Sequence, residues 1–124
     1  MSYKEGNKLP SQRQLKVGEE LRHVISSILS QGDIYHPLLD ENPVTITCVD
    51  VSPNLQNAVV YVMPLGGINI HEMLEVFLEL SNKIRYLVAN KITLKRVPEL
   101  KFKEDTSFAY GGKIDTLLNK SLKQ

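Results

Sequence analysis

The spacing of apolar residues changes along this chain of 124 residues, and the change limits the folds open to it. Residues 17–29 repeat apolar side chains every three or four positions, which predicts an amphipathic helix. Residues 44–51 and 57–63 are rich in β-branched side chains and lie five residues apart, which predicts an antiparallel hairpin. Residues 70–90 return to helical spacing, and residues 99–103 alternate strictly. This order predicts an α+β domain with helices on one face of a small three-stranded sheet.

Capping and turn residues mark the ends of these elements. Ser11 can cap the first helix with its hydroxyl, and Gly32 can end it because glycine adopts the left-handed conformation without steric cost. Asn69 begins a capping pattern for the second helical segment. Residues 33–43, with two prolines, are predicted to form a loop, and residues 114–122 a helical turn or two. Because helices link the second strand to the third, the third strand can pair in parallel.

The first predicted strand changes its apolar phase. Val44, Ile46 and Cys48 share one face, whereas the next apolar residues, Val49 and Val51, belong to the other face. A phase change inside one strand indicates a β-bulge or a strand that is partly buried on both faces.

Composition excludes several classes of protein. Cys48 is the single cysteine, so neither an internal disulfide nor a zinc ribbon can form. No apolar stretch approaches about 18 residues and the start of the chain is polar, so we expect a cytoplasmic protein without a membrane partner. We predict a flexible arm at residues 1–10, one domain at residues 11–118 and a short tail at residues 119–124.

No catalytic constellation is visible in the sequence. His23, His36 and His71 have no metal-ligand spacing to one another or to Cys48, and the glycine pair Gly66-Gly67 is too short to cradle a phosphate. We therefore expect no enzymatic activity, catalytic residue, metal, cofactor or small-molecule substrate.

The charges are segregated although the net charge is only +1. Residues 71–82 carry three glutamates and no lysine or arginine, whereas residues 83–103 carry seven basic residues and one acidic residue. A helix macrodipole alone favours acid early and base late. The basic run continues past the helix to Lys101 and Lys103, which favours a basic surface for a phosphate backbone. Tyr61 and Tyr86 are interpreted, with the other aromatic residues, as core or edge positions without a pair spaced for base stacking.

Three blocks of the sequence resemble the ribosome-binding factor A family. Residues 52–62 (SPNLQNAVVYV) resemble its hairpin motif, and Ile84-Arg85 followed by residues 94–102 (LKRVPELKF) resembles its second block. Residues 105–114, from Asp105-Thr106-Ser107 through Gly111 to Ile114, resemble its C-terminal block, and residues 13–29 fit its first helix. The blocks keep their order over about residues 11–118, and linked blocks are more specific than one motif.

The resemblance implies a single KH-like (type II) domain in the order helix-strand-strand-helix-kink-helix-strand. It also implies a monomeric, non-enzymatic assembly factor that binds the immature small (30S) ribosomal subunit and 16S rRNA. Such a factor aids late maturation and processing of the 5′ end of 16S rRNA and is associated with growth in the cold.

KH domains grip nucleotides with a G-x-x-G loop between two helices, and this chain has none. The kink that replaces this loop in the family falls on Leu80-Ser81-Asn82. The alternative is an uninterrupted helix from Ile70 to Asn90.

The predicted RNA-binding residues are the polar pair at this kink and the basic run that follows. They are Ser81, Asn82, Lys83, Arg85, Lys91, Lys95, Arg96, Lys101 and Lys103. The alternative function is a protein-interaction module that uses the acidic start of the second helix, Glu72 to Glu79, on a basic partner.

Overall fold

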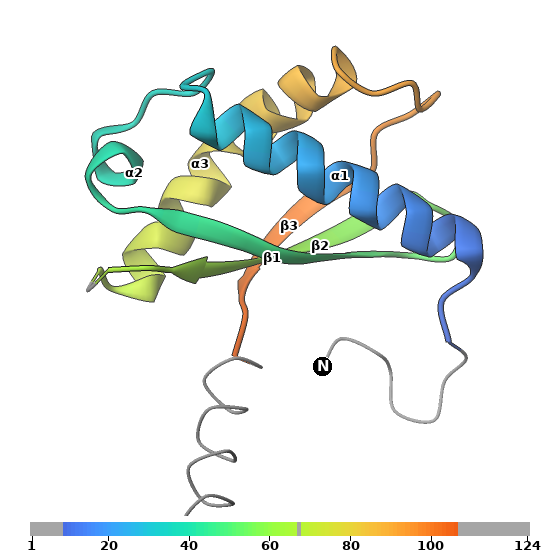
Figure 1. Cartoon of the computed structure of the whole chain (residues 1–124), viewed down its shortest axis with the longest axis horizontal. Helices are drawn as coiled ribbons and strands as arrows, with labels where there is room; N and C mark the ends of the chain where they lie inside the picture. The colour runs from blue at the N-terminus through green and yellow to red at the C-terminus, as the bar shows by residue number, and fades with distance from the viewer. Residues whose placement is uncertain (1–8, 67, 107–124) are drawn as a thin grey trace, which may run out of the picture.

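The computed structural model describes residues 9–66 and 68–106 (Figure 1). The elements are α1 (Gln12–Ser30), α2 (Pro37–Glu41), β1 (Val44–Val51), β2 (Asn57–Pro64), α3 (Ile70–Ala89) and β3 (Glu99–Glu104). The strands form one sheet in the order β1-β2-β3, in which β1 and β2 are antiparallel and β2 and β3 are parallel. The predicted mixed sheet is therefore confirmed. Most of the predicted arm, the predicted C-terminal turns and the tail lie outside the described residues.

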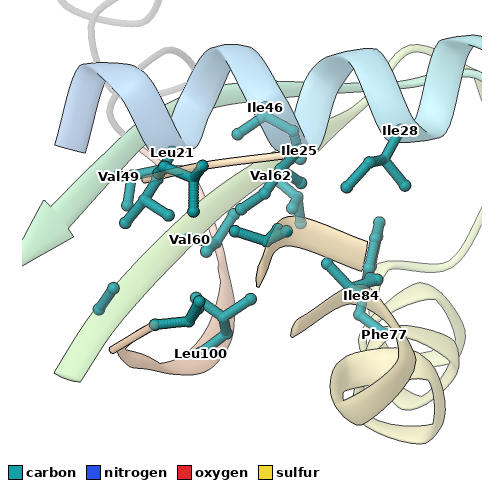
Figure 2. Packing of buried hydrophobic residues seen from close by; sticks show 14 of the residues in the cluster. Leu21, Ile25, Ile28, Ile46, Val49, Val60, Val62, Phe77, Ile84 and Leu100 are labelled. Atoms are coloured by element: carbon teal, nitrogen blue, oxygen red, sulfur yellow. The ribbon is translucent and has the colours of Figure 1, made fainter. Parts of the chain in front are cut away.

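Both long helices pack against the same face of the sheet. Side chains of α1, β2, β3 and α3 meet in one cluster between the helices and the strands (Figure 2). Its fully buried members include Leu21, Ile25, Ile28, Val60, Val62, Met73, Phe77, Ile84 and Val88. Phe77 of α3 stacks on Phe102 of β3 with 4.8 Å between ring centroids. Burial of each large apolar side chain contributes about 1.5–3 kcal/mol, so this cluster holds α1 and α3 to the sheet.

The ends of α1 agree with the sequence prediction. The Ser11 hydroxyl accepts the Gln14 N–H at 3.1 Å, and the Gln14 side chain accepts the Ser11 N–H at 2.8 Å. At the other end Gly32 has φ +77°, and the Asp33 N–H donates to the Ile28 carbonyl. This left-handed residue turns the chain sharply after α1.

The phase change in β1 is a β-bulge, which is the first of the two predicted alternatives. The pairing passes from Ile46 opposite Val62 to Cys48 opposite Tyr61, so Thr47 is an extra residue in β1. Buried side chains then follow at Val49 and Val51, on the phase opposite to Ile46.

Two sequence predictions are corrected by the structure. The predicted loop at residues 33–43 contains the short helix α2, which begins with Pro37 and is capped by the His36 ring accepting the Leu38 N–H. Proline suits the first helical position because it needs no N–H donor there. The predicted kink is replaced by the alternative, a single continuous helix α3. The Ser81 hydroxyl donates to the Leu78 carbonyl at 3.0 Å within α3, so it does not cap a new helix.

Candidate nucleic-acid interface

The basic residues of α3 do not share one face. Lys83 and Arg85 are two positions apart, which separates their side chains by about 200° around a helix. Lys83 is exposed, whereas Arg85 is half-buried on the flank that faces the start of β3. The basic run therefore divides in three dimensions into separate groups.

Arg85 joins α3 to the connection that leads to β3. Its Nε donates to the Pro98 carbonyl at 3.0 Å, and its Nη2 donates to the Val97 carbonyl at 2.9 Å. Pro98 and Val97 are themselves buried. Two of the five guanidinium N–H donors therefore form hydrogen bonds with backbone carbonyls. This gives Arg85 a structural role that the sequence prediction did not include.

Lys91 joins the end of α3 to the turn after α1. Its Nζ lies 3.6 Å from Oδ2 of Asp33, and both side chains are partly open to solvent. An exposed ion pair contributes about 0–1 kcal/mol, so the contact is weak.

Lys95 and Arg96 are exposed in the connection between α3 and β3, drawn in orange in Figure 1. Lys101 and Lys103 are exposed on β3, on the side opposite the inward-pointing Leu100. Within residues 9–66 and 68–106, none of these four side chains forms an ion pair. Their charges are therefore available to a phosphate group.

Lys101 and Lys103 belong to the sheet face that the helices leave open. In register beside Lys103 lies Tyr61, and beside Tyr61 lies Cys48. Burial is the main cause that raises the pKa of the Cys48 thiol, and the charges of Asp50 and Asp105 raise it further. Burial and these two carboxylates also raise the pKa of Tyr61. The open face thus combines positive and negative charge, unlike the connection.

One ion pair on α1 acts electrostatically on the Cys48 thiol. A hydrogen bond from Arg22 lowers the pKa of Glu19, and the same bond raises the pKa of Arg22. Arg22 lowers the pKa of the Cys48 thiol, whereas Glu19 raises it. The pair therefore has opposing effects on the thiol.

The first half of α3 keeps the acidic character that its sequence predicts. Glu72, Glu75 and Glu79 are all exposed. Oε1 of Glu79 lies 4.0 Å from Nε2 of His36, the residue that caps α2. The Asn69 side chain accepts the N–H groups of residues 71 and 72, which confirms the predicted cap. Acid near a helix N-terminus is favoured by the macrodipole.

Tyr86 is exposed on α3, which corrects its interpretation as a core or edge residue. Its exposed fraction is 67%. Ile84 and Val88 are fully buried, and a residue two positions from each lies on the opposite side of the helix. The helical spacing of Ile84 and Val88 was thus a signal that could have identified Tyr86 as exposed.

A groove lies between the C-terminal half of α1, the turn before α2 and the start of β1. Its lining includes Ser26, Ser30, Tyr35, His36 and Thr45. In the described part of the chain, no three His, Cys, Asp or Glu side chains are placed to hold a metal ion. No helix among these residues is both long and apolar enough to cross a membrane.

The fold and the exposed basic residues together define a class of protein. A helix, an antiparallel strand pair, a second long helix and a third strand parallel to β2 form a KH-like α+β domain. The G-x-x-G loop of typical KH domains is absent, and α3 continues through its position.

The comparisons then identify the family. The sequence profile of ribosome-binding factor A matches residues 13–118, so the chain belongs to the ribosome-binding factor A family. The ribosome-binding factor A of Paramagnetospirillum magneticum is 43% identical over 114 residues, which cover 92% of this chain and 80% of the relative. That of Methylocella silvestris is 43% identical over 110 residues, which cover 89% of this chain and 71% of the relative.

Solved structures share the fold. The crystal structure of ribosome-binding factor A from Thermus thermophilus matches with a TM-score of 0.65 and 16% identity, covering 73% of this chain and 93% of that chain. A Thermotoga maritima protein solved by NMR matches with a TM-score of 0.62 and 26% identity, covering 80% and 92% of the two chains. The Thermus protein as fitted into the cryo-EM map of a 30S complex matches with a TM-score of 0.59 and 16% identity, covering 72% and 91%.

Proposed function

We propose that this protein is a ribosome assembly factor that binds the immature 30S subunit and acts without catalysing a reaction. Membership in the ribosome-binding factor A family is the observation that carries the proposal. The Thermus relative has been fitted into a map of a 30S complex, and this chain shares its fold. We extend the proposal to a cytoplasmic monomer that contacts 16S rRNA and aids late maturation and processing of its 5′ end.

The physical support comes from basic side chains that form no ion pair within residues 9–66 and 68–106. Lys95 and Arg96 are adjacent exposed side chains in a connection that contains no acidic residue, so they are the strongest candidates for phosphate contact. Lys83 is a further candidate on α3. Each phosphate that such a residue neutralises releases counterions, which makes affinity fall as salt rises. Arg85 and Lys91 support this surface through their contacts with Pro98 and Asp33, respectively.

The remaining residues of the predicted site contribute less directly. The Ser81 hydroxyl is bonded to a helix carbonyl, while the Asn82 side chain is exposed. Lys101 and Lys103 share the open sheet face with Asp50 and Asp105. We therefore propose that the connection between α3 and β3 forms the centre of the RNA contact and that β3 lies at its margin.

Reversal of two charges in the connection tests this proposal. We expect Lys95→Glu/Arg96→Glu to weaken binding to immature 30S particles at least about ten-fold and to reduce the salt slope by about 1.5–2, because two phosphate contacts are lost. Filter binding across a salt series measures both quantities, and co-sedimentation with immature and mature subunits measures selectivity.

The matched control is Arg13→Glu/Lys16→Glu, since it makes the same change in charge at exposed positions of α1. Binding near wild type by this control would show that position matters more than net charge. If a folded Lys95→Glu/Arg96→Glu variant binds as tightly as wild type, the assignment of the connection is wrong.

A separate observation supports the second candidate function, a protein-interaction module. Glu72, Glu75 and Glu79 are exposed on one side of α3 beside Leu78, whose exposed fraction is 75%. Under that alternative, a Glu72→Lys/Glu75→Lys variant would lose a basic protein partner in a pull-down while the wild-type chain shows little affinity for rRNA.

A further inference from the structure

Tyr86 is a large aromatic side chain that the fold leaves without a packing role. Its exposed fraction is 67%, and it lies near the C-terminal end of α3. Across residues 9–66 and 68–106, its hydroxyl makes no hydrogen bond and its ring stacks on no other ring. The ring is therefore available to an external planar group.

The neighbours of Tyr86 leave the ring open and surround it with polar groups. Asn82 and Lys83 lie one turn before it, and Ala89 and Asn90 lie one turn after it, all exposed. Helical side chains lean toward the N-terminus, so the ring extends over the turn of Asn82 and Lys83. Ala89 is too small to cover the ring from the other side.

The charge around Tyr86 favours an anionic partner. Residues 80–98 contain five basic residues and no acidic residue. The nearest preceding carboxylate on α3 is that of Glu79, which lies beside His36. A nucleotide combines a planar base with a negatively charged phosphate. Exposed aromatic rings in proteins commonly stack on unpaired bases.

We propose that Tyr86 stacks on an unpaired base of single-stranded RNA, with Lys83 at an adjacent phosphate. The amides of Asn82 and Asn90 flank the ring and can hydrogen-bond to the edge of that base. This site extends the RNA contact from the connection onto α3, and it rests on the proposed function.

A fluorescence experiment tests stacking directly, because the chain contains no tryptophan. Tyr86→Trp introduces a single reporter at the proposed site. Tyr35→Trp is the matched control, since Tyr35 is 74% exposed and lies in the turn before α2. Each variant is titrated with immature 30S particles and with a short unstructured oligoribonucleotide. We expect Trp fluorescence at position 86 to fall by about half or more at saturation and at position 35 to change little, because a stacked base quenches the indole.

Removal of the ring supplies the second measurement. Tyr86→Ala is expected to weaken binding to both probes by about ten-fold, while Tyr86→Phe keeps near wild-type affinity because it keeps the stacking surface. The salt slope of Tyr86→Ala stays at the wild-type value, since no charge is removed.

The outcomes separate this inference from the proposed function. If the Trp variant binds immature particles without quenching, or if Tyr86→Ala binds as wild type, the stacking site is wrong while the assembly-factor proposal stands. If immature particles quench the Trp fluorescence but the oligoribonucleotide does not, the result would point to contact with a ribosomal protein. That outcome would also overturn the stacking site. If the wild-type chain binds neither probe, the proposed function itself fails.

Discussion

Gly18 sets how closely α1 approaches the edge of the sheet. A Cβ at this position would lie 2.5 Å from the Val49 carbonyl oxygen. One turn earlier, the Gln14 amide donates to the Val51 carbonyl at 2.8 Å. Because β1 is an edge strand, these contacts cover backbone groups that would otherwise be open to another chain.

We predict that Gly18→Ala destabilises the protein by about 1–3 kcal/mol, because the methyl group must displace the backbone of β1. Alanine is intrinsically the better helix former by about 1 kcal/mol, so a destabilisation here isolates the steric effect. Urea unfolding measures the change. Gly66→Ala is the control, since a Cβ there meets nothing within 4 Å. Unchanged or raised stability in Gly18→Ala would contradict the close approach.

Cys48 provides a prediction about pH. Burial and the nearby carboxylates raise the pKa of its thiol, so less thiolate forms at any given pH. Alkylation of the native protein should therefore reach half its maximal rate at a higher pH than alkylation of the urea-unfolded chain. Asp50→Asn should move the native midpoint down. Equal midpoints for native and unfolded chains would show that the thiol is not perturbed.

At the scale of elements, Arg85 links α3 to the connection that precedes β3. The guanidinium holds the carbonyls of Val97 and Pro98, and the exposed Lys95 and Arg96 lie immediately before them. We therefore propose that Arg85 acts mainly as a positioning residue for the proposed RNA contact.

We predict that Arg85→Met lowers stability by about 2–3 kcal/mol, since hydrogen bonds from a charged group are lost and two carbonyls are left with fewer donors. It should also weaken RNA binding by loosening the connection. A double-mutant cycle with Lys95→Glu/Arg96→Glu should then be non-additive, because the two changes damage the same contact.

Lys83→Met is the matched control for Arg85→Met, since it removes one positive charge from the opposite flank of α3. Its effect on stability should stay within about 0.5 kcal/mol, and its effect on binding should add to that of the connection variant. Additivity for Arg85→Met would indicate that Arg85 contacts RNA independently of the connection.

For the molecule as a whole, the sequence was sufficient to predict most of the architecture. Local signals were sufficient for the caps at Ser11 and Gly32 and for the bulge after Ile46, because each depends on a few neighbouring residues. The parallel third strand followed from the helical link before it.

The partners of the predicted site residues were harder to predict, because tertiary structure decides which charged side chains lie beside one another. Nothing in the basic run indicates that Arg85 bonds to Pro98 or that Lys91 lies beside Asp33, since these partners are set by how the connection folds. The kink that the resemblance implied does not interrupt α3, in which the Ser81 hydroxyl bonds to the Leu78 carbonyl in place of capping a new helix. Tyr86 could have been assigned from helical spacing alone.

The parallel pairing of β2 with β3 also has a consequence for how the chain acquires its structure. The β1–β2 hairpin joins near neighbours, and hairpins of this kind form in about 1–10 μs. By contrast Asn57 pairs with Glu99 and Val62 with Glu104, which closes a segment of about 40 residues that includes all of α3. Closing so long a segment costs entropy before any contact is gained, so we expect docking of the final strand to limit the folding rate. During synthesis, the sheet stays incomplete until residue 104 has left the translating ribosome.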